Sequence, residues 1–250
     1  MTADLGAPIG SGKEAEVYLY RPGWVVKLTR WRRDHAPARR EDAILRALAP
    51  TGLGPAPGGV IEIAGRWGVV MEHIAGPALA ERLGTPDGVA EVLDVMLTLH
   101  RQMHGLAAPS GLPPLKERFV RNIGATRLLD EPTRRRLLDS IPGLPDGDRI
   151  CHGDFHPYNI MGTDESARIV DWLDASAGDP AADVCRTFVL IGAVNTDLAE
   201  RYLNAYCAAA GLDRTAVQAW LPVVAASRLA EKVPDETDRL LALARGKALR

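Results

Sequence analysis

The chain has 250 residues, of which 46% are hydrophobic and 25% charged, and its formal net charge is −2. This length allows one large domain or two lobes, and the charge gives no electrostatic reason to expect nucleic acid or an anionic membrane as a partner. No apolar run is long enough to span a bilayer, and the first five residues lack the basic start and apolar core of a signal peptide. Three widely spaced cysteines argue against a disulfide framework, so we expect a cytoplasmic protein.

Strand signals dominate up to about His73. Short apolar runs bounded by turn residues predict strands at Leu5–Gly10, Val17–Tyr20, Trp24–Leu28, Gly58–Ile63 and Trp67–Glu72. The turns Arg21-Pro22-Gly23 and Ala64-Gly65-Arg66 predict two hairpins. Between the hairpins, Ala36–Leu48 has helical spacing.

Beyond Gly76 the pattern becomes mainly helical. Apolar spacing predicts helices at Val89–Leu97, Leu115–Leu129, Pro132–Ile141, Ala181–Ile191, Thr196–Ala209, Arg214–Ala230 and Glu236–Ala248. Three short apolar runs predict small strands at Arg149–Cys151, Asn159–Met161 and Arg168–Val170. The sequence therefore predicts an α+β protein with a small sheet-rich lobe, residues 1–75, and a larger helical lobe, residues 76–250.

A glycine-rich turn, Gly10-Ser11-Gly12, precedes the first predicted hairpin. Small residues allow backbone N–H groups to approach a phosphate closely. The turn is not a P-loop, because Gly12-Lys13 is followed by Glu14 rather than Ser or Thr and no helix follows. A simple hairpin turn without a ligand remains the alternative.

Lys27 lies between apolar residues on a predicted strand, where it could neutralise nucleotide phosphates if a carboxylate held it in place. Glu41 fits that task, because Ile44, Leu45 and Leu48 follow it at helical spacing and share its face. Asp42 is the neighbouring alternative. A surface lysine beside a solvated helix is the other reading, since Lys and Glu are usually exposed.

The stretch Ile150–Ile160 places several polar residues on a loop between predicted strands. Asp154 could accept a proton from a hydroxyl group, and Asn159 with Asp171 offers the oxygen ligands that Mg²⁺ prefers. A zinc hydrolase built from Cys151, His152, Asp154 and His156 is the rival, but Gly153 and Pro157 break any helix that could carry the histidines.

A second pair of histidines, His100 and His104, has helical spacing but lacks the intervening glutamate of a zinc protease. We interpret both side chains as structural.

Together these stretches resemble the protein-kinase-like fold, most closely its aminoglycoside phosphotransferase branch, which also contains choline and fructosamine kinases. The loop His152-Gly153-Asp154-Phe155-His156-Pro157-Tyr158-Asn159-Ile160 is similar to that branch's catalytic loop. Ile169-Val170-Asp171-Trp172 stands where protein kinases have D-F-G, and Gly178–Val184 resembles the element that follows. Leu99–Gly105 resembles the end of the family's long helix. The resemblance covers nearly the whole chain and is most specific from His152 to Asp183.

The resemblance implies roles for individual residues. Asp154 would be the catalytic base, Asn159 and Asp171 would hold Mg²⁺, Lys27 would contact the phosphates of ATP or GTP, and Glu41 would position Lys27. The glycine-rich turn, Gly10, Ser11 and Gly12, would cover the phosphates, and the hinge Met71, Glu72, His73 and Ile74 would contact the base. Asp183 would brace the catalytic loop, and His152 would be structural. Ala15 departs from the third glycine of the kinase pattern.

The implied function is transfer of a phosphoryl group from ATP or GTP to a hydroxyl group of a small molecule, with an aminoglycoside or related amino-sugar or amino-alcohol favoured. Nucleic acid and membrane are not expected as partners, and a monomer or a homodimer is. Carboxylates that could bind a cationic acceptor are Asp174, Glu231, Asp235, Glu236 and Asp238. A protein kinase is less favoured, because no recognisable activation segment lies between Asp171 and Asp183. A catalytically silent nucleotide-binding module is the other alternative.

Overall fold

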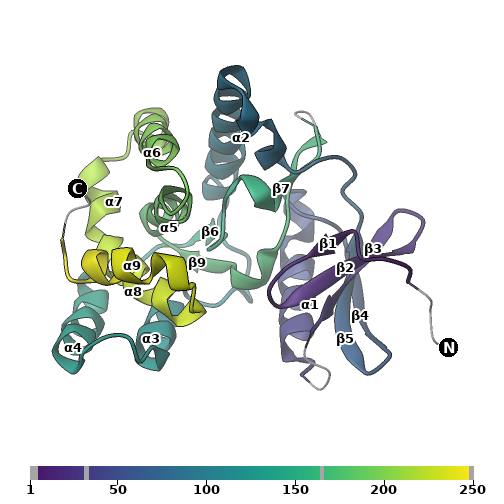
Figure 1. Ribbon diagram of the computed structural model, residues 1–250, viewed down its shortest axis with the longest axis horizontal. Helices are drawn as coiled ribbons and strands as arrows, with labels where there is room; N and C mark the ends of the chain where they lie inside the picture. The colour runs from purple at the N-terminus through teal and green to yellow at the C-terminus, as the bar shows by residue number, and fades with distance from the viewer. Residues whose placement is uncertain (1–4, 31–33, 164–165, 248–250) are drawn as a thin grey trace. The chain divides into compact units, whose positions relative to one another are not determined.

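The computed structural model describes residues 5–30, 34–163 and 166–247 (Figure 1). By packing, these residues divide into two compact units. The first runs to Glu81 and also contains Pro109–Gly111 and Tyr158–Leu173, whereas Arg82–Ala108, Leu112–Pro157 and the chain from Asp174 onward form the second. The boundary near Gly76 stays a prediction, but the packing shows that Asn159 and Asp171 belong with the N-terminal sheet.

An antiparallel sheet forms the centre of the first unit. Its strands follow the order β1-β2-β3-β5-β4, with bounds Gly10–Ser11 (β1), Ala15–Arg21 (β2), Trp24–Thr29 (β3), Pro57–Ile63 (β4) and Arg66–Glu72 (β5). Both predicted hairpins are confirmed. The predicted strand Leu5–Gly10 is wrong except at its last residue, because pairing with β2 begins only where Gly10 faces Val17.

The two faces of this sheet follow from the alternation of side chains along β3. Val26 and Leu28 join Ile63 and Val70 in a core on one face. Lys27 points to the opposite face, because successive strand residues alternate. Helix α1, Ala36–Leu48, packs against β3, β4 and β5 and begins and ends where the sequence predicted.

Two further short strands complete the first unit. Strand β7, Ile160–Met161, pairs with β8, Arg168–Ile169, so that Ile160 faces Ile169. The backbone N–H of Val170 donates to the carbonyl of Asn159 at 2.9 Å. The antiparallel pairing therefore brings the backbones before β7 and after β8 together.

The second unit is mainly helical. Helix α5, Pro180–Gly192, is buried along nearly its whole length and packs against α6, α7 and α8 (Figure 1). The remaining elements are α2 (Pro86–His104), α3 (Leu115–Ala125), α4 (Glu131–Ser140), α6 (Thr196–Ala210), α7 (Arg214–Ala219), α8 (Leu221–Arg228), α9 (Thr237–Ala244), β6 (Arg149–Cys151) and β9 (Ser176–Gly178). The α+β class is confirmed.

Some predicted helices have different bounds in the structure. The predicted helix Arg214–Ala230 is two helices, because Pro222 has no N–H to continue the ladder and a new helix begins at Leu221. Leu115–Leu129 ends at Ala125, and Glu236–Ala248 is described as Thr237–Ala244, with Ala248 outside the described residues.

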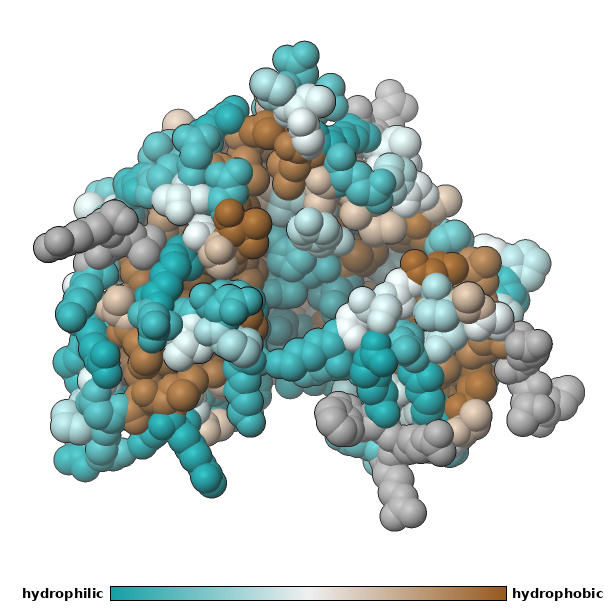
Figure 2. All heavy atoms as spheres, viewed as in Figure 1, coloured by the Kyte–Doolittle hydropathy of each residue, from teal (hydrophilic) through white to brown (hydrophobic). Residues whose placement is uncertain are grey.

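Polar side chains cover much of the protein surface, as expected of a globular protein. Figure 2 shows hydrophilic side chains spread over much of the visible face of each unit, with hydrophobic groups scattered between them. Among the helices within the described ranges, none combines the length and apolar character needed to cross a membrane.

Candidate functional site

Lys27 is the centre of an ion-pair cluster in the first unit. Its Nζ lies 3.0 Å from Oε1 of Glu41 on α1 and 2.6 Å from Oδ1 of Asp171, which follows β8. Burial by itself would lower the pKa of Lys27, but the charges of Glu41 and Asp171 outweigh it and raise that pKa above its ordinary value. Lys27 is therefore a fixed cation, not the surface lysine of the alternative reading.

The structure also separates Glu41 from its neighbour. Glu41 is 4% exposed and faces Lys27, in line with its place on the apolar face of α1. Asp42 instead accepts from Nε of Arg46 at 2.8 Å, one turn further along the same helix. Glu41, and not Asp42, is in position to hold Lys27.

Asp171 has an unusual backbone. Its φ is 63°, in the left-handed region that non-glycine residues rarely occupy, and such conformations cost of order 1–3 kcal/mol. Its carboxylate remains 44% exposed although one oxygen binds Lys27. Asn159 is linked by its carbonyl to the residue before Asp171. The strained backbone thus holds an accessible carboxylate close to the Asn159 backbone, which is a reason to look for a ligand here.

The glycine-rich turn is tied down by a residue that the sequence analysis did not single out. The Gly12 N–H donates to the Ala15 carbonyl at 2.9 Å and closes the turn. Arg30 follows β3 and donates from Nε to the Gly12 carbonyl at 3.0 Å and from Nη2 to Oγ of Ser11 at 2.7 Å. Its Nη1 lies 3.0 Å from Oε1 of Glu16. Arg30 therefore fixes the shape of the turn from the side of the sheet.

The predicted hinge follows the last strand of the sheet. Met71 is buried and faces Val25 across the β3–β5 pair, on the same face as Lys27. The Glu72 N–H donates to the Ala56 carbonyl, and the Glu72 carboxylate accepts from the Ala56 N–H at 3.1 Å. The next N–H, of His73, donates to Gly23, and Ile74 is half-buried beyond the strand. Pairing on both sides thus holds this segment in place.

The catalytic loop predicted around Asp154 lies in the second unit, where Asp183 braces its backbone. The two carboxylate oxygens of Asp183 accept from the N–H groups of His152 at 2.8 Å and Gly153 at 2.7 Å. Thr187, one turn further along α5, donates to the Phe155 carbonyl at 2.9 Å. The bracing expected of Asp183 is confirmed.

Asp154 itself lies beside a histidine and an arginine. Its Oδ2 is 3.5 Å from Nε2 of His156, and its Oδ1 is 3.4 Å from Nη2 of Arg186 on α5. Burial by itself would raise the pKa of Asp154, but the hydrogen bond with His156 and the charge of Arg186 hold it well below its ordinary value. Asp154 is therefore ionised at neutral pH.

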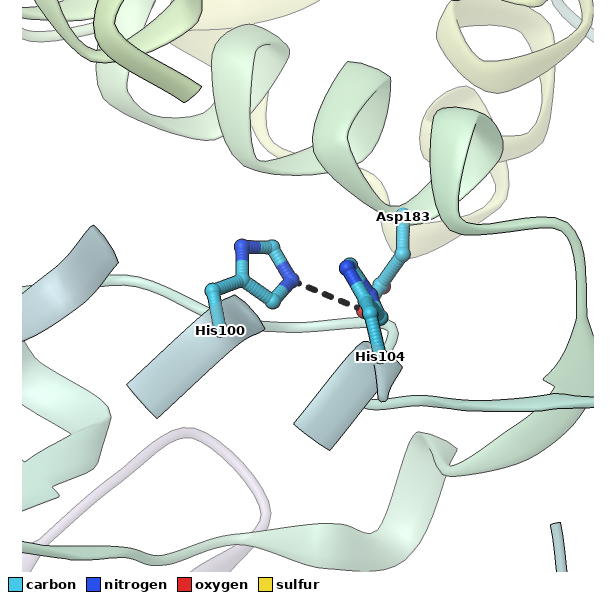
Figure 3. Close-up of side chains that lie close together, drawn as sticks. All are labelled: His100, His104 and Asp183. Atoms are coloured by element: carbon cyan, nitrogen blue, oxygen red, sulfur yellow. Dashed lines mark hydrogen bonds and ion pairs between the residues drawn. The ribbon is translucent and has the colours of Figure 1, made fainter. Parts of the chain in front are cut away.

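The histidines of α2 complete the support of this loop. Figure 3 shows His100 and His104 with their rings directed at the Asp183 carboxylate, and their Nε2 atoms lie 3.1 and 3.2 Å from its Oδ2. Because a carboxylate only accepts, each Nε2 donates, and each Nδ1 pairs with a tyrosine hydroxyl, that of Tyr202 at 2.5 Å and that of Tyr206 at 2.7 Å. The Asp183 carboxylate, the two rings and the two hydroxyls therefore form one hydrogen-bond network.

His100, His104 and Asp183 lie close enough together to hold a metal ion. Among the parts of the chain described, no other group of His, Cys, Asp or Glu side chains does. Zinc would need imidazole nitrogens without protons at about 2.0–2.1 Å. Here the Nε2 atoms of His100 and His104 carry protons and donate them to the Asp183 carboxylate. The structural interpretation of His100 and His104 is supported. The zinc site considered around Cys151 is not supported, because Cys151 contacts the Asp179 carbonyl.

The buried network predicts acid sensitivity of the fold. Burial, followed by the charge of His104, lowers the pKa of His100 to about 3. Below about pH 6.5 the unfolded chain takes up a proton at this residue and the folded chain does not, so the free energy of unfolding falls as pH drops from about 6.5 towards about 3. The depressed pKa of Asp183 acts in the same direction below about pH 4. Denaturant titrations at pH 7, 5.5 and 4.5 measure the slope.

The matched variant for this experiment is His100→Gln, whose side-chain nitrogen can replace the Nε2 donor without titrating. We expect a smaller pH slope for this variant than for the wild type. Equal slopes for the two proteins would contradict the assignment to His100.

Most carboxylates predicted to bind a cationic acceptor already have partners. Asp174 lies 2.6 Å from Nη2 of Arg118, Glu231 lies 2.6 Å from Nη2 of Arg186, and Glu236 is bound through both oxygens by Arg228. Asp235 and Asp238 are exposed.

The predicted site residues thus fall into two groups. Lys27, Glu41 and Asp171 are in direct contact, and Asn159 belongs to the same unit. Asp154 belongs to the other unit, on the same loop and five residues before Asn159. The sequence analysis missed Arg186, although its position one helical turn after Asp183 was a usable signal, and it missed Arg118, for which the sequence carries none.

Comparison with known proteins bears on the whole chain. A sequence model of the phosphotransferase enzyme family, APH, matches residues 6–220. No curated protein matches the chain.

Three solved structures with a similar fold are distant from this chain in sequence. A thermostable mutant of the aminoglycoside phosphotransferase APH(4)-Ia, in a ternary complex with AMP-PNP and hygromycin B, has a TM-score of 0.68 at 16% identity, covering 98% of this chain and 91% of that one. A choline/ethanolamine kinase family protein from Mesorhizobium loti has a TM-score of 0.64 at 19% identity, covering 98% and 89%. APH(2")-IIIa with GDP and kanamycin has a TM-score of 0.59 at 18% identity, covering 94% and 89%. The predicted kinase-like fold is confirmed.

Proposed function

This chain belongs to the phosphotransferase enzyme family, and on that premise we propose that it transfers the γ-phosphate of ATP or GTP to a hydroxyl group of a small molecule. The observation that carries the proposal is the half-buried Lys27, bound at once to Glu41 and to the accessible carboxylate of Asp171. A lysine that one carboxylate positions, beside a second carboxylate that can bind Mg²⁺, is the arrangement that phosphoryl transfer uses in kinases.

The first unit would bind the nucleotide. We assign the phosphates to Lys27 and to the backbone N–H groups of Gly10, Ser11 and Gly12, and the base to the hinge Met71, Glu72, His73 and Ile74. Glu41 would position Lys27. The similar folds that hold AMP-PNP or GDP support a nucleoside triphosphate as the donor.

Asn159 and Asp171 fit a magnesium ion. Both offer oxygen donors, which Mg²⁺ prefers, and the strained Asp171 keeps its carboxylate accessible. Bound there, Mg²⁺ would neutralise charge on the phosphates.

Asp154 would act on the acceptor. The acceptor oxygen attacks the γ-phosphorus, the bond from that phosphorus to the bridging oxygen breaks, and the nucleoside diphosphate leaves with the electron pair. Asp154 orients the attacking hydroxyl and receives its proton, for which it must be ionised, as its lowered pKa ensures. Positioning and charge neutralisation supply most of the rate in such reactions.

The acceptor that the family favours is an aminoglycoside or a related amino-sugar or amino-alcohol. Both carboxylate oxygens of Glu231 and of Glu236 accept hydrogen bonds from arginines, and one oxygen of Asp174 does. They therefore have little charge to offer a ligand with several ammonium groups. The exposed Asp235 and Asp238 are the better candidates for contacts with a cationic acceptor.

A nucleotide-consumption screen tests the proposed function. Purified protein with Mg²⁺ and either ATP or GTP is incubated with aminoglycosides, choline, homoserine and sugar amines, and phosphorylated products are identified by mass spectrometry. The proposal requires nucleotide turnover that depends on an added hydroxyl compound and yields its phosphate ester. Phosphate incorporation into proteins but into no small hydroxyl compound would contradict it.

Replacing Lys27 with methionine tests the nucleotide site. Charge-assisted hydrogen bonds contribute about 1.5–3 kcal/mol, so we expect the Kd for AMP-PNP with Mg²⁺ to rise about tenfold to a hundredfold in calorimetric titrations. The double variant Lys27→Met with Glu41→Gln also removes the buried negative charge that Lys27 neutralises, and it should bind AMP-PNP equally weakly. Lys116→Met, which removes a lysine paired with the exposed Asp146, is the matched control. Unchanged affinity in both Lys27 variants would contradict the assignment.

A further inference from the structure

Two buried arginines lie against the catalytic loop of the second unit. Arg186 donates from Nε to the Gly153 carbonyl at 3.0 Å, and Arg118 on α3 donates from Nη1 to the same carbonyl at 3.2 Å. Their side chains are 5% and 6% exposed. The fit is tight, because a Cβ at Gly153 would lie 2.2 Å from Nη1 of Arg118. Two charged side chains therefore help to hold the backbone that carries Asp154.

Arg186 also lies between two carboxylates. Its Nη2 is 2.6 Å from Oε1 of Glu231 and 3.4 Å from Oδ1 of Asp154. Buried ion pairs cost desolvation energy and are often no more stable than apolar packing of the same volume. A guanidinium kept in this place is thus poorly explained by stability alone. Arg186 is a cation that both Asp154 and Glu231 contact, so its removal takes a shared positive charge away from two negative groups.

We infer that Arg186 is a positioning residue for phosphoryl transfer, which orients the Asp154 carboxylate and shields it from Glu231. The inference rests on the proposed function, because it takes Asp154 to be the base. Arg186 binds Oδ1, and Oδ2 lies on the side of His156. The carboxylate therefore has one defined orientation towards an acceptor hydroxyl.

The ionisable groups around Asp154 support this role. His152 and His156 act on it from the loop, Arg186 from α5, Arg118 from α3 and Arg228 from α8. Glu231, just beyond Arg186, is the nearby carboxylate with which Asp154 shares that guanidinium. Removing Arg186 therefore takes away a cation in contact with the base and exposes the base to a like charge, which raises the pKa of a carboxyl group.

The experiment compares Arg186→Met and Arg186→Lys with wild type and with Arg214→Met, which removes an arginine from the partly exposed ion pair with Glu200. With an acceptor from the screen, we expect Arg186→Met to lower kcat about 100-fold, the size of effect that misplacement of a reacting group produces. The KM for nucleotide should change less than twofold, and the acidic limb of the pH profile should move to higher pH. Arg186→Lys should recover part of kcat, and Arg214→Met should resemble wild type.

A second readout does not need an acceptor. In protein labelled with ¹³C at aspartate carboxyl carbons, the Asp154 signal, assigned by its loss in Asp154→Asn, should show an ionised group down to about pH 4 in wild type and titrate at higher pH in Arg186→Met. Thermal unfolding identifies variants that lose activity by unfolding.

The two possible failures are distinguishable. If no hydroxyl compound is phosphorylated, the proposed function fails, while the carboxyl titration still tests the contact between Arg186 and Asp154. If Arg186→Met is folded and its kcat, pH profile and Asp154 titration match wild type, the positioning role is wrong. A loss of kcat with unmoved pH profile and carboxyl titration would also overturn it, since a purely structural role explains that result.

Discussion

Asp154→Asn is expected to lower kcat about 10²- to 10⁴-fold, the contribution that a positioned general base makes. The amide keeps the shape of the side chain but cannot accept the hydroxyl proton as a carboxylate does. Because Asp154 contacts His156 and Arg186 and belongs to the unit that does not carry Lys27, nucleotide affinity should change little. Steady-state kinetics on the acceptor identified by the screen, with calorimetric titration of AMP-PNP, measure both quantities.

The matched control is Asp148→Asn, which changes an aspartate that is 80% exposed on the same segment of the chain. It should keep wild-type kcat. If Asp154→Asn turned over every tested acceptor at the wild-type rate, Asp154 would not be the base, and the assignment of the loop to the acceptor hydroxyl would have to be abandoned.

Asp183→Asn is expected to have the largest effect on stability, a loss of about 3–5 kcal/mol in the free energy of unfolding. The carboxylate is 1% exposed and accepts from the N–H groups of His152 and Gly153 and from the rings of His100 and His104. An asparagine replaces one acceptor oxygen with an NH₂ group, whose hydrogens would point at N–H donors. Equilibrium denaturation by urea at pH 7 measures the change.

The control here is Asp197→Asn on α6, whose side chain is 83% exposed and lies 4.0 Å from Arg201. Substitutions of this kind usually change stability by no more than about 0.5 kcal/mol. Amide hydrogen exchange adds a local readout. The N–H groups of His152 and Gly153 donate to different oxygens of Asp183, so Asp183→Asn removes the acceptor of one of them, and that amide should exchange faster. Stability within 1 kcal/mol of wild type would show that the four hydrogen bonds do not act as one network.

Local patterns determined most of the elements. Helix α1 has the predicted bounds because its apolar residues repeat at helical spacing over a full 13 residues. The same spacing placed Glu41 on the inner face, where it contacts Lys27. Local patterns failed where a single residue decides, as at Pro222, which divides a helix that apolar spacing alone would continue.

Local sequence patterns could not predict contacts between distant segments. Lys27 and Asp171 are 144 residues apart and meet because β3 and β8 belong to one unit, which no local pattern indicates. The acceptor carboxylates are a second case. Glu231 and Glu236 look available in the sequence, yet both are bound to arginines in the structure.

The sequence by itself determined the α+β class, the loop around Asp154 and its resemblance to a phosphotransferase family, because these depend on residue types at fixed short spacings. Only the tertiary structure decided that Arg186 and Arg118 hold that loop, that Arg30 ties the glycine-rich turn, and that Asp183 collects four hydrogen bonds. The physical reason is that charged side chains are usually exposed, so a sequence gives no sign that one is buried. Burial depends on which helices pack together.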